Sequence, residues 1–524
     1  MGYIKKIHIE GFKKFKKIDI NFNENVNIII GENESGKSTV LEAISIVLGQ
    51  KYKNVDKAVI GELLNIDNIN YFKCNPCIDN LPQIIIQVEF VTDYKHPESF
   101  FGENNIEKKE NFGILFECKY IDDPEYGLDE KIKSGIIPLE YYSLSWNTFQ
   151  GSSYSLLKKP LETLFIDTSE ETRSNSFNYY NKTIFNKNFD NKIKMKIKDN
   201  FRDNLHQSFL ELQMDPIDEK RCFGINDKKV ILESIISINE DGIPIENKGS
   251  GMENLIKTEI ALTRQEKHFD VILIEEPENH LSYTNMNKMI KEIVNKQDSS
   301  QIILTTHSDL IASSLDLKNI LWIQENQVKS LKEVKEDDSK FFIKAPNNNL
   351  LTFLLSKRII LVEGPTEYLL VPMFYKQITG NSIEEDEISI IACNGLSYQR
   401  YLNISKDLGK KVCVITDNDE KEENIKMMKE YNQNNNFSHI FMSKDINNFT
   451  WEVCLFNVNK DILKQIISTE EGANYYYKRN NALDIHCKKM LNNKVDTAYE
   501  LLVNEQITLT PPDYVKDAIE WVRS

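Results

Sequence analysis

The strongest chemical signal in the sequence is a glycine-rich turn between two regular segments. The string GENESGKST at residues 31–39 has the spacing G-x-x-x-x-G-K-[ST]; it follows the apolar run VNIII (26–30) and precedes a helical pattern that continues to residue 49. In such a turn backbone N–H groups close around phosphate oxygens, the lysine neutralises the β- and γ-phosphates, and the next hydroxyl binds Mg²⁺. The sequence therefore predicts an ATP-binding P-loop. Its candidate nucleotide-binding residues are Gly31, Asn33, Gly36, Lys37, Ser38 and Thr39, with Ser38 also a candidate Mg²⁺ ligand.

Two later strand patterns end in residues that a P-loop needs for hydrolysis. VILIEEPENHL (271–281) is a buried-strand run that ends in Glu275 and Glu276 before a proline. We predict that Glu275 lies behind the Mg²⁺ and that Glu276 polarises the attacking water. QIILTTHSD (301–309) is a second such run, and His307 follows it where α/β sheets bind ligands. We expect His307 to sense the γ-phosphate.

A Gly-Ser-Gly turn within NKGSGM opens a further helical pattern. Ser250 and Gly251 would present a helix N-terminus to an anion, although these residues taken alone are equally compatible with a flexible turn. Residues 171–215 are first polar and rich in asparagine, and then helical in period. We interpret this stretch as an inserted helical module that contributes to dimer contact.

Together, the P-loop, the strand-end acids and the Gly-Ser-Gly turn resemble the ABC-type ATPases, in the branch of structural-maintenance-of-chromosomes and RecF-like proteins. The resemblance implies that the signature turn of one subunit caps the nucleotide bound by another, and therefore a dimer. The strand-like runs 84–91 and 113–121 suit the antiparallel subsheet of such domains. The signature here is KGSGM rather than the LSGGQ type, and the metal acid is Glu275 rather than an aspartate.

From about residue 340 the pattern restarts as a second series of alternating strands and helices. This alternation predicts a second α/β domain with a mostly parallel sheet. Carboxylates gather where its first and third strands should end, and brought together they would form an all-oxygen pocket for a hard divalent cation. The candidate metal ligands are Glu363, Glu367, Asp417 and Asp419.

The strings VEGPTE and TDND resemble the TOPRIM domain, which topoisomerases, primases and several nucleases share. The resemblance implies a cluster of Mg²⁺ (or Mn²⁺) ions that acts on phosphodiester bonds, with Glu363 as a metal ligand or base. It also implies a third acid after the following strand, which Glu452 supplies. Glu452 could equally be a helix-start residue that favours the helix dipole.

The order of all these motifs resembles the OLD (overcoming lysogenization defect) family, over nearly the whole chain. The resemblance implies an α/β fold in which an ABC-type ATPase domain (1–340, with the helical dimerisation insertion near 171–215) precedes a TOPRIM nuclease domain with C-terminal helical elements (341–524). It implies an ATP-binding and ATP-hydrolysing, divalent-metal-dependent DNA endonuclease of anti-phage defence. Such proteins act alone or beside a helicase or a retron reverse transcriptase with its DNA, as homodimers or higher homo-oligomers.

The C-terminal segment ITLTPPDYVKDAIEWV (507–522) predicts an amphipathic helix after two prolines. Its expected apolar contacts are Tyr514, Val515, Ala518 and Trp521. Lys516 lies in the first turn, where a cation is unfavourable against the helix dipole, and a residue placed against local preference can serve a site. The segment resembles the C-terminal part of OLD nucleases, which carries a lysine near the metals, so we expect Lys516 to stabilise the phosphate charge in catalysis. The alternative is a solvated lysine whose stem covers an apolar helix face.

Composition limits the remaining classes. The 524 residues carry a net charge of −16, which disfavours a general nucleic-acid coat but allows local basic strips to contact phosphates. The apolar runs are too short for a membrane span and the N-terminus lacks a signal-peptide pattern, so we expect a cytoplasmic protein without membrane contact. The single CxxC pair (Cys74, Cys77) favours free thiols over a zinc site.

Two other functions compete with the nuclease. The first is a non-catalytic, ATP-driven DNA clamp or sensor, which has no chemical need for the convergent carboxylates. The second is a topoisomerase or primase, but no second CxxC supplies the zinc ribbon that primases often have.

Overall fold

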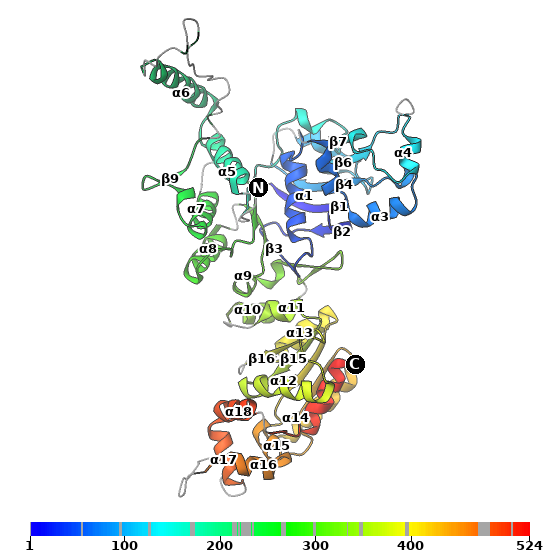
Figure 1. Ribbon diagram of the computed structural model, residues 1–524, viewed down its shortest axis with the longest axis vertical. Helices are drawn as coiled ribbons and strands as arrows, with labels where there is room; N and C mark the ends of the chain where they lie inside the picture. The colour runs from blue at the N-terminus through cyan, green and yellow to red at the C-terminus, as the bar shows by residue number, and fades with distance from the viewer. Residues whose placement is uncertain are drawn as a thin grey trace. The chain divides into compact units, whose positions relative to one another are not determined.

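The structure of the chain is a computed structural model that divides into two compact units (Figure 1). It describes residues 2–524 apart from 54–55, 94–96, 124–126, 168–172, 212–216, 218–220, 222–231, 233–234, 264–268, 297–299, 333, 345–348, 394–397, 470–482 and 505–506. Unit 1 is Met1–Glu333 and unit 2 is Val334–Ser524.

The division between the units lies before helix α10 (Glu336–Lys344), whereas the sequence placed the domain boundary between residues 340 and 341. The reason is a buried ion pair. Asp338 of α10 is 2% exposed, and its carboxylate accepts hydrogen bonds from Arg400 and Asn403 of helix α13 (Tyr398–Leu408). This pairing attaches α10 to the second unit.

Unit 1 contains two larger sheets. The first is antiparallel with the strand order β2-β1-β4-β6-β5, and β7 pairs with β6. Its strands are β1 (Tyr3–Phe12), β2 (Phe15–Asn21), β4 (Ile84–Val91), β5 (Phe101–Gly102), β6 (Asn111–Tyr120) and β7 (Tyr142–Thr148). β4 and β6 are the two strands that the runs 84–91 and 113–121 predict.

The second sheet carries the predicted nucleotide motifs and has the order β14-β13-β3-β12-β11-β8. All neighbours are parallel except β14, which pairs antiparallel with β13. The strands are β3 (Val26–Gly31), β8 (Thr163–Ile166), β11 (Val271–Glu275), β12 (Gln301–Thr305), β13 (Ile320–Gln324) and β14 (Gln327–Ser330). β3, β12 and β11 are adjacent, so the P-loop and both predicted strand ends meet at one edge.

Helix α1 (Lys37–Gly49) packs between the two sheets of unit 1 and contacts strands of both. Because Val40, Leu41, Ile44 and Val47 are all fully buried, the helix is apolar on nearly every side, as a helix enclosed by two sheets requires. This packing fixes the P-loop at the N-terminus of α1.

Between β8 and the predicted signature turn lie helices α5 (Arg173–Asn188) and α6 (Asn191–Glu211), which occupy most of the stretch interpreted as an inserted helical module (Figure 1). The described side chains of α6 include none that is buried within the chain. The signature helix α7 (Ser250–Thr263) follows, then α8 (Tyr283–Lys296) and α9 (Asp309–Ser314). The dimer contact assigned to this module stays a prediction.

Other short elements of unit 1 are α2 (Ile60–Leu63), α3 (Ile66–Cys74), α4 (Asp129–Lys133), β9 (Asn239–Glu240) and β10 (Ile243–Pro244).

Unit 2 is built on a parallel four-stranded sheet of order β16-β15-β17-β18, which confirms the predicted second α/β domain. The strands are β15 (Arg358–Val362), β16 (Ile388–Ala392), β17 (Lys411–Ile415) and β18 (Ser438–Phe441). β15 and β17 are almost wholly buried, as expected for strands covered on both faces. They are neighbours, so their carboxyl ends lie side by side.

Helices complete unit 2, and several of them position the predicted metal ligands. They are α11 (Leu350–Leu355), α12 (Pro365–Thr379), α13, α14 (Glu422–Asn434), α15 (Trp451–Val458), α16 (Lys460–Ile466), α17 (Ile485–Asn492), α18 (Lys494–Val503) and α19 (Asp513–Arg523). α12 packs against α18 and α19, and α19 covers β17 and β18. None of the helices in the described part of the chain has the length and apolar character needed to cross a membrane.

Candidate functional site

The P-loop has the strained backbone that its glycines permit. Gly36 has a φ of 99° and an added Cβ would collide with the ring of Phe15, so only glycine fits at this position. Lys37 is buried, and its Nζ donates to the carbonyl oxygens of Gly31 (3.1 Å) and Glu32 (3.0 Å). Burial lowers the pKa of Lys37, while Glu276, Glu278 and Glu275 act in the opposite direction. These two hydrogen bonds hold the ammonium group of Lys37 against the backbone of the P-loop.

The predicted pair of Mg²⁺ ligands is in direct contact. Ser38 donates a hydrogen bond to the carboxylate of Glu275 at the end of β11. Burial raises the pKa of Glu275; the bond from Ser38 opposes this, and Asp167 and Glu276 add to the rise. The hydroxyl at the start of α1 and the half-buried carboxylate at the end of β11 therefore meet where a cation bound to phosphate would lie.

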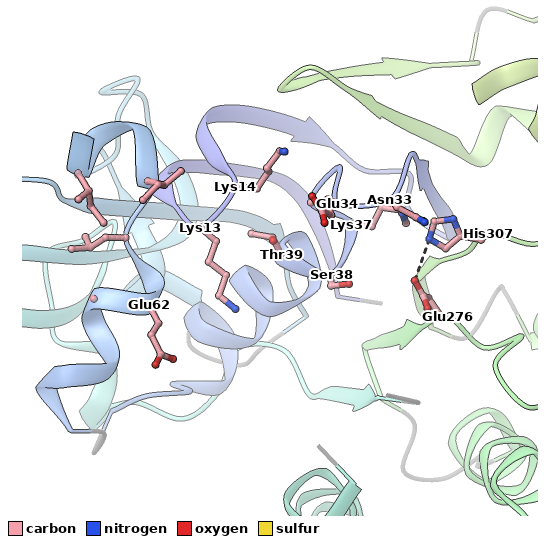
Figure 2. Close-up of a pocket in the computed structure, with 15 residues that line it drawn as sticks. Lys13, Lys14, Asn33, Glu34, Lys37, Ser38, Thr39, Glu62, Glu276 and His307 are labelled. Carbon is pink, nitrogen blue, oxygen red and sulfur yellow. Dashed lines mark ion pairs between the residues drawn. The ribbon is translucent and has the colours of Figure 1, made fainter. Parts of the chain in front are cut away.

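Glu276 and His307, the two residues predicted to act in hydrolysis, face one another. His307 Nε2 lies 3.2 Å from Glu276 Oε1, as Figure 2 shows, and Asn279 Nδ2 donates to Glu276 Oε2 at 3.1 Å. Glu276 has a φ of 41°, a conformation that costs about 1–2 kcal/mol for an L residue. Its N–H donates to Thr305 on the adjacent strand, which helps to hold this conformation.

These residues line one open pocket of about 680 Å³ (Figure 2). Asn33, Gly36, Lys37, Ser38, Thr39, Glu276 and His307 all belong to its lining. The pocket continues away from the P-loop to Lys13, Lys14 and Glu62, which the sequence reasoning did not select.

Glu278 is a further acid that the sequence reasoning missed. Its Oε1 accepts from Thr306 Oγ1 (2.8 Å) and from the backbone N–H of His307 (2.5 Å), while its buried Oε2 has no hydrogen-bond partner in the described structure. Glu278 therefore fixes the backbone that carries His307. The signal for it was the third carboxylate of the string EEPE (275–278).

Ser250 and Gly251 are not among the residues that line this pocket, although they begin helix α7 as predicted. An added Cβ on Gly251 would collide with the carbonyl oxygen of His280, so this glycine lets α7 approach the turn after β11. This is compatible with the site that the family resemblance implies, in which the signature turn of a second subunit caps the nucleotide. That shared site stays a prediction.

In unit 2 the acids after β15 and β17 are joined by hydrogen bonds. Glu363 Oε2 accepts from Thr416 Oγ1 (3.1 Å) and from the backbone N–H of Asp417 (3.3 Å). Glu367 lies in the first turn of α12, is 6% exposed, and accepts from the backbone N–H of Gly364 (3.1 Å). The bond to Gly364 fixes Glu367 at the helix start beside Glu363.

The charges of this acidic site are poorly compensated. Burial raises the pKa of Asp417 to about 9, with further contributions from Glu363, Glu367 and Glu452, while Lys494 opposes them. Burial also raises the pKa of Glu367 to about 7, with contributions from Glu452 and Glu363, while a hydrogen bond from its own backbone opposes the rise. Four carboxylates thus repel one another around one ammonium group.

Glu452 satisfies both interpretations that the sequence left open. It is in the first turn of α15, and its buried carboxylate faces the other three acids, with Lys494 Nζ at 2.9 Å. Asp419 is exposed, as Glu363 is, and both of them add to the effect of burial in raising the pKa of Tyr398. The acids that add to the effect of burial on the pKa of Asp417 are Glu363, Glu367 and Glu452. We therefore define the acidic site as Glu363, Glu367, Asp417 and Glu452 with Lys494, and place Asp419 at its rim.

The donor set of the acidic site fits a hard divalent cation, because every available ligand is a carboxylate oxygen in a locally negative environment. The arrangement is open: among the described residues, no three histidine, cysteine or acidic side chains form a group close enough to hold one ion. A cation would have to draw the carboxylates together.

The structure does not place Lys516 in the acidic site. Its side chain is 56% exposed, and Nζ lies 4.0 Å from Glu520 one turn along α19. The buried face of α19 comprises Tyr514, Val515, Ala518, Ile519 and Val522, and Lys516 is on the opposite side. Its placement matches the solvated lysine that we set against the catalytic role. Lys494 instead has the position expected of Lys516: it is the first residue of a helix, α18, and it lies beside the acids.

Comparison with known proteins agrees with both halves of this geometry. A family model described as "AAA ATPase domain" matches residues 3–145 and 155–312, more than half of the chain. A second, "Overcoming lysogenization defect protein-like, TOPRIM domain", matches residues 354–419. An endonuclease GajA of Bacillus cereus (strain VD045) is 23% identical over 459 residues, covering 79% of this chain and 74% of GajA. The Old nuclease of Escherichia phage P2 is 26% identical over 169 residues, 30% of this chain and 29% of its own length.

The fold and the two sites define an ABC-type ATPase joined to a TOPRIM domain, as predicted. The chain belongs to the OLD (overcoming lysogenization defect) family of ATPase–TOPRIM nucleases.

The raised pKa of Asp417 predicts how stability depends on pH without metal. The folded carboxyl holds its proton up to a pH of about 9, whereas in the unfolded chain it titrates near its ordinary value of 3.8. The folded state therefore binds the extra proton between these values, and stability is lost as the pH rises from about 4 towards 9. Asp417→Asn, a neutral isostere, should raise the Tm of the metal-free protein at pH 8, by roughly 2–4 °C for each kcal/mol of repulsion removed. Thermal melts at pH 5 and pH 8 measure this, with Asp419→Asn as the exposed control. A lower Tm for Asp417→Asn at pH 8 would contradict the prediction.

The contact between Glu276 and His307 predicts a separation of ATP binding from hydrolysis. Glu276→Gln keeps the side-chain shape but removes the charge that orients water, so hydrolysis should slow by about 10²–10⁴-fold while ATP affinity changes little. Rates at saturating ATP and direct nucleotide binding check this, with Glu62→Gln at the far end of the pocket as the control. Hydrolysis at the parental rate in Glu276→Gln would remove this role from Glu276.

Proposed function

We propose that the chain is an ATP-binding and ATP-hydrolysing, divalent-metal-dependent DNA endonuclease, with the ATPase in unit 1 and DNA cleavage in unit 2. The observation that carries the proposal is the acidic site, in which four carboxylates with a single lysine adjoin the ends of two neighbouring parallel strands. A cluster of carboxylates that repel one another suits a site that binds cations, because the bound cations neutralise the repulsion. The names of the relatives, an endonuclease and a nuclease, support the same reaction class.

In this proposal Glu363, Glu367 and Asp417 hold Mg²⁺ or Mn²⁺, with Glu452 and Asp419 as further ligands. Divalent cations at such a site stabilise the attacking and leaving oxygens of an in-line phosphoryl displacement. Two hydrogen bonds to its Oε2, from Thr416 and from the Asp417 N–H, orient Glu363, which in this proposal is a metal ligand or base. Lys494 is half-exposed and holds its ammonium against Glu452 at 2.9 Å, from where it can stabilise negative charge on the phosphate.

In unit 1, Gly31, Asn33, Gly36, Lys37, Ser38 and Thr39 would surround the phosphates, and Glu275 would bind Mg²⁺ through or beside Ser38. Glu276 would orient the attacking water, and His307, which Glu278 holds by its backbone, would sense the γ-phosphate. Ser250 and Gly251 would cap the nucleotide of a second copy. The functional unit would then be a homodimer, or a higher homo-oligomer, with α5 and α6 contributing to the contact.

The proposed cellular role is anti-phage defence in the cytoplasm, with DNA as the substrate. A helicase, or a retron reverse transcriptase with its DNA, is the kind of partner that the family implies. The non-catalytic clamp remains the second candidate, and the acidic site argues against it, because a clamp gains nothing from a cluster of like charges.

The two units should be separable by mutation. Asp417→Ala and Glu363→Ala each remove a ligand from the acidic site, so they should abolish cleavage of supercoiled plasmid in Mg²⁺ or Mn²⁺ while ATP hydrolysis persists. Lys37→Ala should instead abolish ATP binding, because it removes the charge that faces the phosphates. Glu422→Ala, at an exposed position in unit 2, controls for surface charge. Plasmid that the parent leaves uncut under all metal conditions would favour the clamp.

The two candidate lysines can be compared directly. Lys494→Gln should lower cleavage by about 10²–10³-fold, as for the loss of one transition-state donor, with ATP hydrolysis unchanged. Lys516→Gln is the matched control and should cut at nearly the parental rate, because the side chain lies on the solvent face of α19. Melting temperatures of both variants show whether the fold is intact. The reverse ranking would return the catalytic role to Lys516.

A further inference from the structure

Asn418, the central residue of TDND, is enclosed by backbone. Its side chain is 1% exposed, and Nδ2 lies within hydrogen-bond distance of three carbonyl oxygens, those of Ser443 (3.1 Å), Asp445 (3.0 Å) and Asn448 (3.2 Å). Its Oδ1 accepts the backbone N–H of Glu420 at 2.9 Å. Both polar atoms of the side chain are therefore used inside the protein, and neither faces the acidic site.

The turn after Asn418 is strained. Asp419 and Glu420 have φ values of 56° and 58°, two consecutive left-handed residues of which neither is glycine. This conformation is unfavourable for L residues other than glycine, so the pair persists only where its surroundings hold it in place. The bond from the Glu420 N–H to Asn418 Oδ1 closes this turn, and the Asp419 N–H donates to the carbonyl oxygen of Phe449 at 3.3 Å. Asn418 thereby fixes the direction in which Asp419 leaves the strand end.

The three carbonyls that Asn418 contacts belong to the segment that leads into α15. Asn448 O also accepts from Cys454 Sγ at 3.3 Å, within the same helix that carries Glu452. One side chain thus connects the end of β17, with Asp417 and Asp419, to the segment that positions Glu452.

We propose that Asn418 is a positioning residue that sets the spacing of Asp417, Asp419 and Glu452, and so the affinity of unit 2 for divalent cations. The inference rests on the proposed function, in which these acids hold the metal. Without the amide, the 443–448 segment loses its attachment to β17 and the strained turn can relax. The carboxylates would then be held less firmly in the positions from which a cation draws them together. Partners of this kind, which hold the ligands without touching the metal, typically change metal affinity by about 10–100-fold.

The test separates positioning from plain stability by using a matched asparagine. Asn459 is 4% exposed, and its side chain also clamps backbone, donating to Leu455 O and Thr510 O and accepting from the Thr510 N–H, but it lies at the other end of α15 from Glu452. Mn²⁺ binding to the full chain is titrated by electron paramagnetic resonance for the parent, Asn418→Ala and Asn459→Ala. The Tm of each is measured without metal.

We expect Asn418→Ala to bind Mn²⁺ about 10–100-fold more weakly, and its cleavage to recover as Mn²⁺ is raised. Asn459→Ala should lose Tm while keeping its Mn²⁺ affinity within about twofold of the parent. If Asn418→Ala does not fold, Asn418→Ser retains one donor for the three carbonyls, and the expected weakening is read from it. Parental Mn²⁺ affinity in a folded Asn418 variant would overturn the positioning role alone. A parent that binds no Mn²⁺ would overturn the proposed function with it.

Discussion

Repulsion within a cluster of carboxylates, of which Glu367 and Glu452 are buried, is the constraint on which unit 2 depends. Glu363 and Asp417 follow adjacent parallel strands, and Glu367 and Glu452 enter from the first turns of two helices. Lys494 supplies one positive charge to these four acids, and burial together with this imbalance raises the pKa of Asp417 to about 9 and that of Glu367 to about 7. A site of this kind is costly to fold and becomes favourable only when a cation or protons neutralise it.

Unit 1 uses the same geometry with a different charge balance. Its acids also follow a strand of a parallel sheet, but each of them has a fixed partner. Ser38 donates to Glu275, His307 faces Glu276, and Glu278 accepts from the backbone N–H of His307 in the turn after β12. Lys37 lies in the electrostatic range of all three glutamates. The charges of the ATPase site are therefore distributed over fixed partners, which suits a site that binds a preformed complex of nucleotide and metal. In unit 2 the proposed metal is instead the main counter-charge.

Features that depend on a short stretch of sequence, such as strands and the residues that follow them, could be predicted well. The strands β4 and β6 could be predicted because an apolar strand pattern is visible without knowing which strand it pairs with. The P-loop, Glu275, Glu276 and His307 could be predicted because each follows a strand pattern, and these strands belong to one parallel sheet. Lys494 was missed because its partner Glu452 is distant in sequence and belongs to another helix. Lys516 was selected instead because a cation is unfavourable at a helix start. The same helix was predicted to bury Tyr514, Val515 and Ala518, and this face leaves Lys516 on the solvent side. Glu278 and Asn418 act through backbone groups of other segments; the third carboxylate of EEPE (275–278) points to Glu278, but no spacing in the sequence indicates Asn418.

The most direct test of the central claim is the number of protons released when the metal-binding site fills. Calorimetric titration of the protein with Mn²⁺ at pH 8, in two buffers of different ionisation enthalpy, gives that number. Because Asp417 holds a proton at this pH in the metal-free fold, the account predicts release of about one proton per site, and little or none from Asp417→Asn. Binding of Mn²⁺ to the parent without proton release would show that Asp417 is already ionised, and would contradict the account.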